Sequence, residues 1–360
     1  DCSILEEKCS NEKVRILTAE QRARGESKPI TISPTEAFRE NIIISPWLAY
    51  WMCVSKRFIS MIGVSDENNY FEEKLPSERA HYSRQTFDQI VIVDKWGKLE
   101  VSGHAYRHSY DLERHAKYSG SDLYALRQLK EPLVIKKRIA RYDKKLILNI
   151  YGPRAGEVFK VLSNYSSEEL LKVLESAVGD NVVIDGITIP KSVFVVEDSV
   201  EKVWVEKFIP HVSEPSFGAE RLMYIALEYA YRELENGRIV LSLPKKLAPI
   251  KVGIATLVDK PLFKSMASKI YEMIKSRYYV LILEGESIGK KYAIADEIGI
   301  PFVVTIDYES ISTGSTVTVR DRDTRRQVRV PLQDLVNVLD IGLEGYDIFS
   351  LSYQVIEPKD

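Results

Sequence analysis

The regular alternation of apolar strands and helices after residue 250 constrains the fold more than any other feature of this sequence. A strand–helix–strand–helix–strand order favours a right-handed parallel sheet. A hairpin at 316–320 and 327–330 adds two more strands, so we expect a C-terminal α/β domain over 246–360 with a mixed, mainly parallel sheet. The alternating elements are expected as strands at 251–257, 278–283 and 302–306 and helices at 261–276 and 288–298.

The earlier residues show a different pattern, in which strands are joined by short turns. A strand, a turn and a second strand at 90–101 are typical of an antiparallel pair. The sequence therefore predicts an α+β arrangement with a first core part at 1–113, an insertion domain at 114–205 and a return to the core at 206–245. Further elements are expected as strands at 14–17, 145–150, 181–189 and 206–212, an extended linker at 28–34, and helices at 35–63, 166–177 and 217–235.

The charge balance limits the kinds of partner that the chain can have. Its 50 basic and 52 acidic residues give a net charge of -2, which excludes a uniformly basic coat but not a local basic patch. No uncharged apolar run reaches the ~18 residues of a membrane helix, so we expect no membrane partner. The start of the chain does not have the pattern of a secretory signal. Three cysteines without a CxxC pair favour a reducing, cytoplasmic location.

A carboxylate and an arginine follow each other closely where a strand leads into a helix, in Glu214-Pro-Ser-Phe-Gly-Ala-Glu-Arg221. An arginine in the first turns of a helix can present a planar, permanently charged fork to an anion. The alternative is that Ser216 only caps the helix and Arg221 is a surface residue. A similar pair, Glu100 and Arg107, flanks a glycine-containing turn, where two solvated charges are the alternative interpretation.

Three histidines lie close together in the sequence, at His104, His108 and His115, near Glu113. Their spacings of four and seven suit metal ligands on one helix face. Gly103 argues against a regular helix there, so exposed or hydrogen-bonded histidines are the preferred interpretation.

Two segments are rich in basic residues, 136–145 and 320–329. Either is able to hold phosphates, and the alternative for each is a solvated face. Because Asp321 and Asp323 offset part of the charge in the second segment, it is better suited to reading bases than to clamping phosphates. The segment Ser287-Ile-Gly-Lys-Lys291 lacks the GxxxxGK[ST] spacing, so a phosphate loop is rejected.

Together these motifs resemble glycyl-tRNA synthetase of the dimeric archaeal and eukaryotic type, a class II aminoacyl-tRNA synthetase. The resemblance covers nearly the whole chain, and several long motifs in the right order make it specific. The matching segments are Glu100 to Leu112, Glu214-Pro-Ser-Phe-Gly to Arg221, Ser287 to Gly299, Val304-Thr-Ile-Asp307, Arg320-Asp-Arg-Asp323, Ala80-His-Tyr82 and Lys130-Glu-Pro132.

The resemblance implies part of a class II antiparallel sheet with an α+β insertion, followed by an anticodon-binding domain. It implies that glycine and ATP give glycyl-adenylate, from which glycine passes to the 3′ end of tRNA(Gly). We expect the chain to begin after the family's motifs 1 and 2, so that the complete enzyme is a homodimer or uses an N-terminal partner chain. The alternative is a non-catalytic nucleic-acid-binding protein on a synthetase-like scaffold.

The resemblance also implies which residues bind glycine. Glu214 would hold the ammonium group, next to Pro215, and Ser216 would crowd the α-carbon. Arg107 would orient the substrate carboxylate or the adenylate. Since glycine has no side chain to grip, selectivity must come from the held ammonium and from walls that exclude a methyl group.

For ATP and tRNA, the implied residues lie in other motifs. Arg221 would bind the γ-phosphate end of ATP. Glu100 and the backbone of Val101 would lie at the ATP, with Glu100 at its Mg²⁺. The implied anticodon-binding residues are Arg320, Asp321, Arg322 and Asp323.

Overall fold

The computed structural model describes residues 3–235, 237–285 and 287–358. The chain divides into two compact units, one of residues 112–210 and one that combines residues 1–111 with residues 211–360. The four-part division expected from the sequence stays a prediction. Within the described residues, no helix is long and apolar enough to span a membrane.

A six-stranded sheet with the order β10-β5-β4-β3-β1-β2 forms the first part of the larger unit. Its neighbouring strands are antiparallel except for β1 and β3, which are parallel. The expected hairpin is therefore confirmed as β4 and β5, and β2 replaces part of the expected linker. The strands are β1 (Val14–Leu17), β2 (Ile30–Ile32), β3 (Asn69–Glu73), β4 (Gln85–Val93), β5 (Gly97–His108) and β10 (Val212–Phe217).

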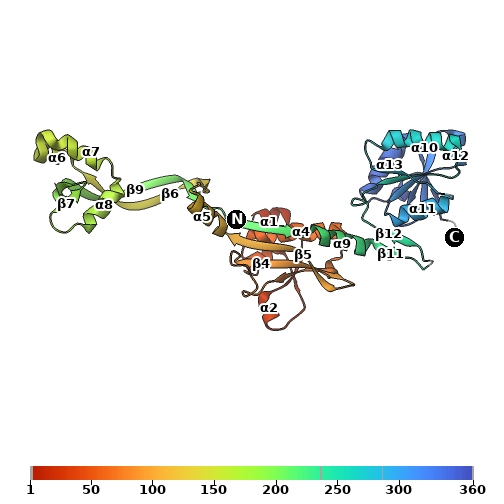
Figure 1. The fold of residues 1–360 in the computed structure, drawn as a ribbon, viewed down its shortest axis with the longest axis horizontal. Coiled ribbons are helices and arrows are strands. Elements are labelled where there is room, and N and C mark those ends of the chain that lie inside the picture. The colour runs from red at the N-terminus through yellow and green to blue at the C-terminus, as the bar shows by residue number, and fades with distance from the viewer. Residues whose placement is uncertain (1–2, 236, 286, 359–360) are drawn as a thin grey trace. The chain divides into compact units, whose positions relative to one another are not determined.

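Helix α4 covers one face of this sheet (Figure 1), where the buried Ser55 of α4 donates a hydrogen bond to Gln89 of β4. The single helical region expected at 35–63 is two helices, because Asn41 takes a left-handed backbone with φ 57° and Pro46 starts a new helix. The helices of this part are α1 (Ser3–Lys8), α2 (Ala19–Ala23), α3 (Pro34–Arg39), α4 (Pro46–Met61) and α9 (Ala219–Ala230).

The helix expected to continue to residue 235 ends at Ala230 instead. The next residues form strand β11 (Tyr231–Glu233), which pairs in an antiparallel hairpin with β12 (Ile239–Leu241). Tyr231 and Arg232 therefore satisfy their backbone groups across a hairpin, which helical periodicity does not reveal.

The C-terminal sheet has six strands in the order β14-β13-β15-β16-β17-β18. β13 is parallel to both β14 and β15, which confirms the expected βαβαβ unit. The other three pairings are antiparallel, so the expectation of a mainly parallel sheet is wrong although the sheet is mixed. The strands are β13 (Val252–Thr256), β14 (Val280–Ile282), β15 (Phe302–Ile306), β16 (Thr316–Asp321), β17 (Gln327–Pro331) and β18 (Gln354–Ile356).

Helices cover both faces of this sheet (Figure 1). Val252 and Ile254 of β13 pack in a core with α10 and α13, whereas Ala255 packs in a second core with α11. Thus the connection after β13 leads to one face and the connection after β14 leads to the other. The helices are α10 (Pro261–Ile274), α11 (Ile288–Glu297), α12 (Tyr308–Thr313) and α13 (Leu335–Leu343).

The smaller unit is a long two-stranded antiparallel ribbon, β6 (Ala125–Tyr142) with β9 (Phe194–Phe208), that leads to a compact cluster of helices and a hairpin (Figure 1). The strand expected at 145–150 is wrong: helix α6 forms there because the Asp143 carboxylate accepts hydrogen bonds from the backbone N–H groups of Lys145 and Leu146. The other elements are α5 (Tyr110–Ser119, at the boundary), α6 (Lys144–Tyr151), α7 (Ala155–Leu162), α8 (Ser167–Ser176), β7 (Asn181–Ile184) and β8 (Ile187–Pro190).

Candidate active site

A polar cavity of about 360 Å³ lies on the N-terminal sheet, at strands β4, β5 and β10. Glu214 and Arg221, the two ends of the motif that the sequence singled out, both line this cavity. The residues that line it are Lys74, Tyr82, Thr86, Asp88, Glu100, Val101, Ser102, Gly103, Ala105, Glu214, Ser216, Phe217, Gly218 and Arg221.

Strand register brings the cavity residues together in rows. Residues directly opposite each other in an antiparallel pair share one face of the sheet. Thr86 and Glu214 both lie opposite Ala105, from the two neighbouring strands. In the next row Asp88 and Ser216 lie opposite Gly103, the one position of the row without a side chain. This absence leaves room between a carboxylate and a hydroxyl.

A β-bulge in β5 places Glu100 on the same face. Gln89 pairs with Ser102, but the next residue of β4, Ile90, pairs with Glu100 rather than with Val101. Side chains alternate along a strand, so one extra residue moves every residue beyond it to the other face. Without the bulge, the Glu100 carboxylate would lie on the side covered by α4.

Arg221 reaches the cavity from the first turn of α9. Its guanidinium donates a hydrogen bond of 2.7 Å to the backbone carbonyl of Glu100, and one of its nitrogens lies 3.8 Å from the Glu100 carboxylate. Gly218 is the N-cap residue of α9, and its N–H donates to the carbonyl of Val101 at 3.0 Å. A Cβ atom at Gly218 would lie 3.3 Å from the Arg221 side chain, so glycine allows the arginine to fold close to the turn. Ser216 is therefore not the helix cap.

Arg107 is engaged by protein groups rather than projecting freely into the cavity. Its guanidinium donates to the Asp111 carboxylate at 2.6 Å and to the Glu214 carboxylate, and it lies 4.0 Å from the centre of the Tyr82 ring. The hydrogen bond to Asp111 and then that to Glu214 raise the pKa of Arg107 further, so it stays charged. In this arrangement Arg107 fixes where the Glu214 carboxylate points.

Asp88 is a cavity carboxylate that the motifs did not reveal. Burial and then the neighbouring Glu100 carboxylate raise the pKa of Asp88, against the Lys74 ammonium group 3.2 Å away. Its signal in the sequence was the alternation of polar Thr86 and Asp88 with apolar Phe87 along β4, combined with the hairpin register. The bulge that adds Glu100 left no such signal.

Two of the predicted site residues, Pro215 and Val101, differ from the others in where their side chains lie. Pro215 lies opposite His104 in the strand pairing, which puts it on the other face from Glu214. The Val101 side chain is buried, and its carbonyl is occupied by Gly218. Both residues therefore shape the strands at the cavity edge.

The three histidines are not brought together. His104 is buried, with its ring 5.4 Å from that of Phe71, and His108 faces His211 at 3.7 Å between ring centres. His115 lies on α5. Within the part of the chain that the structure describes, no group of three or more His, Cys, Asp or Glu residues is arranged to hold a metal ion.

The predicted anticodon-binding residues lie mainly inside the C-terminal domain. Arg320 forms a two-pronged ion pair with Asp296, and both side chains are almost fully buried. Arg322 is also buried and donates to the carbonyls of Gly299 and Leu243 at 3.0 and 2.8 Å. These side chains are used to hold the domain together, and their reading of a base stays a prediction that this burial weighs against.

The two acidic residues of that motif, Asp321 and Asp323, differ in exposure. Asp321 is buried and pairs with Lys245, and its carboxylate accepts a hydrogen bond of 2.8 Å from the backbone N–H of Thr324. Desolvation, the largest single cause, raises the pKa of Asp321, but the Lys245 contact and the hydrogen bonds from Thr324 together lower it below its usual range. Asp323 is the accessible residue of the four, with a side chain 39% exposed.

Comparison with known families agrees with this architecture. Residues 251–340 match the family described as "Anticodon binding domain". The chain is 45% identical over 333 residues to "Glycine--tRNA ligase" of Aeropyrum pernix, covering 92% of this chain and 56% of that protein. It is 36% identical over 308 residues to the protein of that name in Pyrococcus furiosus (85% and 54% covered), and 34% identical over 340 residues to that in Methanocaldococcus jannaschii (91% and 58% covered).

The class of protein that the chain resembles is therefore the aminoacyl-tRNA synthetases. Within that class its relatives are glycine–tRNA ligases, so the resemblance seen in the motifs is confirmed. The chain spans about half the length of the curated relatives it matches.

Proposed function

We propose that this chain provides the glycine- and ATP-binding cavity and the tRNA-binding domain of a glycine–tRNA ligase. It would act together with the segment that its relatives have outside the matched region. The observation that carries the proposal is the shared cavity of Glu214 and Arg221, in which one carboxylate is held by Arg107 and the guanidinium lies beside Glu100. The class II fold stays part of this proposal, as does either a homodimer of the complete enzyme or an N-terminal partner chain.

The reaction needs no activated side-chain nucleophile. A glycine carboxylate oxygen attacks the α-phosphorus of ATP, and the bond to pyrophosphate breaks to give glycyl-adenylate. The terminal ribose hydroxyl of the tRNA then attacks the glycyl carbonyl, and AMP leaves. The protein contributes positioning and charge stabilisation, which suits a cavity of fixed ionic groups.

Glu214 holds the glycine ammonium. Arg107 keeps the Glu214 carboxylate in place through the hydrogen bond between the two side chains. Ser216 and Asp88 border the space above Gly103, where the α-carbon lies. A larger amino acid is rejected because its side chain would need that same space. Because glycine has no side chain for the protein to bind, this steric exclusion supplies the selectivity.

Arg221 binds the negatively charged phosphate chain of ATP. Mg²⁺ commonly binds through one or two carboxylates together with substrate phosphates, and the half-exposed Glu100 carboxylate beside Arg221 fits that donor set. When bound, the ion would neutralise charge on the phosphates.

The proposal is tested by glycine-dependent ATP–pyrophosphate exchange with a polypeptide that joins this chain to the remaining segment of its relatives. We expect exchange with glycine and none with alanine. Binding of tRNA without any glycine-dependent exchange would contradict the proposal and support the non-catalytic alternative. ATP binding measured with and without the added segment shows how much of the site this chain supplies.

A further inference from the structure

A network of buried hydrogen bonds lies behind the candidate active site, on the face of the N-terminal sheet that α4 covers. Gln89 of β4 is fully buried, and its carboxamide oxygen accepts hydrogen bonds from the hydroxyl groups of Ser55 on α4 and Ser102 on β5, the latter at 2.8 Å. Its amide nitrogen donates to the side-chain oxygen of Asn69 on β3 at 3.1 Å. One carboxamide thus joins a helix and three strands.

The network continues along β5 to the buried imidazole of His104, whose Nε2 atom lies 3.0 Å from the Ser102 hydroxyl oxygen. The single hydroxyl proton of Ser102 goes to Gln89, so the Ser102 oxygen accepts a hydrogen bond from His104. The imidazole N–H is therefore on Nε2, and burial keeps the ring neutral by lowering its pKa to about 3. A neutral imidazole thus completes the donor and acceptor pattern around Ser102.

Gln89 and Ser102 form the last residue pair before the bulge in β5. They lie directly opposite each other, whereas the next residue of β4, Ile90, lies opposite Glu100, so that Val101 is the extra residue. The hydrogen bond between the Gln89 and Ser102 side chains therefore sets the register of the two strands at the edge of the bulge.

The bulge follows from two constraints, one on each side of it. At the hairpin turn, Val93 lies opposite Gly97, which takes a left-handed backbone with φ 71°. On the other side, the network places Gln89 opposite Ser102. Because the stretch of β5 between these two points is one residue longer than the stretch of β4, one residue of β5 is left without a partner.

An unbulged pairing would break one of these constraints. If Gln89 stayed opposite Ser102, the Glu100 carboxylate would turn to the face that α4 covers, where burial of a charge is unfavourable. If the turn kept its register, Gln89 would lie opposite Val101, whose side chain has no hydrogen-bonding group, and a buried amide would lose a partner. The bulged register avoids both losses.

The backbone of the bulge also holds the start of α9. The carbonyl of Val101 accepts a hydrogen bond from the N–H of Gly218 at 3.0 Å, and the carbonyl of Glu100 accepts one from the Arg221 guanidinium at 2.7 Å. Loosening the bulge therefore moves the Glu100 carboxylate and the anchor of Arg221 together. The glycine end of the cavity depends less on the bulge, because Glu214 belongs to β10, whose partner residues in β5 lie beyond it.

We propose that Gln89 and Ser102 are positioning residues for the ATP end of the candidate active site. From the opposite face of the sheet, their hydrogen bond holds the bulge that turns the Glu100 carboxylate into the cavity and keeps the anchor of Arg221 in place. The kinetic consequence rests on the proposed function, whereas the effect on the bulge does not.

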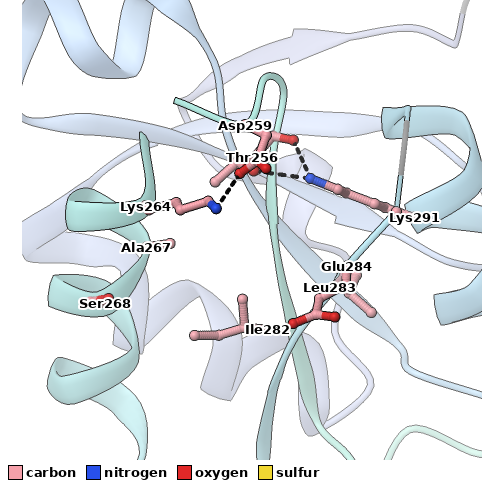
Figure 2. A pocket seen from close by; sticks show the side chains of 10 residues that line it. Thr256, Asp259, Lys264, Ala267, Ser268, Ile282, Leu283, Glu284 and Lys291 are labelled. Atoms are coloured by element: carbon pink, nitrogen blue, oxygen red, sulfur yellow. Dashed lines mark hydrogen bonds and ion pairs between the residues drawn. The ribbon is translucent and has the colours of Figure 1, made fainter. Parts of the chain in front are cut away.

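Two substitutions of similar shape separate the hydroxyl group from side-chain size. Ser102→Thr keeps the hydroxyl that donates to Gln89, and Ser102→Val lacks it. Thr256→Val is the matched control, since it removes a buried hydroxyl that accepts from the Lys291 ammonium group at 3.0 Å in the C-terminal domain (Figure 2). If Ser102→Val does not fold, Ser55→Ala takes its place, because it removes the other hydroxyl from Gln89.

Amide hydrogen exchange in the 360-residue chain measures the state of the bulge directly. We expect the Gly218 amide, which donates to Val101, to exchange about tenfold faster in Ser102→Val than in Ser102→Thr or the control. An unchanged rate in Ser102→Val, or the same increase in Ser102→Thr, would overturn the inference.

The kinetics are measured in the polypeptide that joins this chain to the remaining segment of its relatives. In glycine-dependent ATP–pyrophosphate exchange, Ser102→Val should raise the KM for ATP about five- to tenfold and change the KM for glycine less than about twofold. Ser102→Thr and Thr256→Val should behave like the unaltered protein.

The two measurements separate the inference from the proposed function. An unchanged KM for ATP in Ser102→Val, or an equal rise of both KM values, would refute the positioning role even where the bulge is loosened. If the unaltered polypeptide shows no pyrophosphate exchange, the proposed function fails, and the Gly218 amide still decides whether the Ser102 hydroxyl holds the bulge.

Discussion

Glu214 and Arg221 line one cavity although they belong to different elements, a strand and the helix that follows it. The carboxylate is fixed by Arg107 from the neighbouring strand, and the guanidinium is fixed by the Glu100 backbone carbonyl. In the proposed function these two charges would meet the ammonium group of glycine and the phosphate chain of ATP.

The Glu214 carboxylate should be essential for adenylate formation. In the complete enzyme, Glu214→Gln should lower the rate of glycine-dependent ATP–pyrophosphate exchange about ten- to hundredfold, because it removes a charged hydrogen bond worth about 1.5–3 kcal/mol. The affinity for tRNA should change little. Glu220→Gln, an exposed neighbour on α9, is the control. Normal exchange in the Glu214 variant would refute the assigned role.

Gly103 should matter for activity and not for stability. A Cβ atom there would lie 3.9 Å from Asp88, an ordinary contact, and alanine in a strand is about 0.5–1 kcal/mol better than glycine. Gly103→Ala should therefore unfold at equal or higher urea concentration while its KM for glycine rises. Gly156→Ala in α7 should be stabilising without any kinetic change. An unchanged KM in the first variant would show that glycine does not lie over Gly103.

The Arg320 side chain should stabilise the folded protein. Arg320→Ala removes the two-pronged partner of the buried Asp296 carboxylate, which keeps its contact with Arg238 at 2.8 Å, and should lower the free energy of unfolding by up to about 3 kcal/mol. Arg326→Ala breaks a surface pair with Glu357 and should cost less than about 1 kcal/mol. Urea denaturation measures both. A stable Arg320 variant that has lost anticodon discrimination would instead restore the base-reading role.

His104 should make the protein sensitive to acid. Burial lowers its pKa to about 3, whereas the unfolded chain binds this proton near pH 6.5. The unfolded state thus takes up more protons as pH falls below 6.5, so stability is complete above that pH and is lost toward pH 3. Between pH 7 and 5 this group contributes a loss of about 2 kcal/mol.

His104→Leu should remove that part of the pH dependence, as shown by urea midpoints at pH 7 and pH 5. His115→Leu, exposed on α5, should leave the pH dependence as it is. Equal pH dependence in the His104 variant and the unaltered protein would contradict a neutral, buried imidazole.

Hydrophobic periodicity was sufficient to predict the helices and strands that have a strong local sequence pattern. The three parallel strands around β13 and the hairpin of β4 and β5 follow from apolar runs and turns. It failed where a nearby group decided the outcome, as with the Asp143 cap that turns 145–150 into a helix. The end of α9 at Ala230 likewise depends on a partner strand that only tertiary contacts supply.

The sequence by itself determined the family resemblance, the charged motif from Glu214 to Arg221 and the order of the C-terminal elements, because these depend on residues close together in the chain. Only the tertiary structure decided which charges share a space. Strand register added Asp88, one bulged residue turned Glu100 toward the cavity, and burial withdrew Arg320 and Arg322 into the domain interior. A one-residue shift reverses the face of a side chain, and local sequence does not encode such a shift.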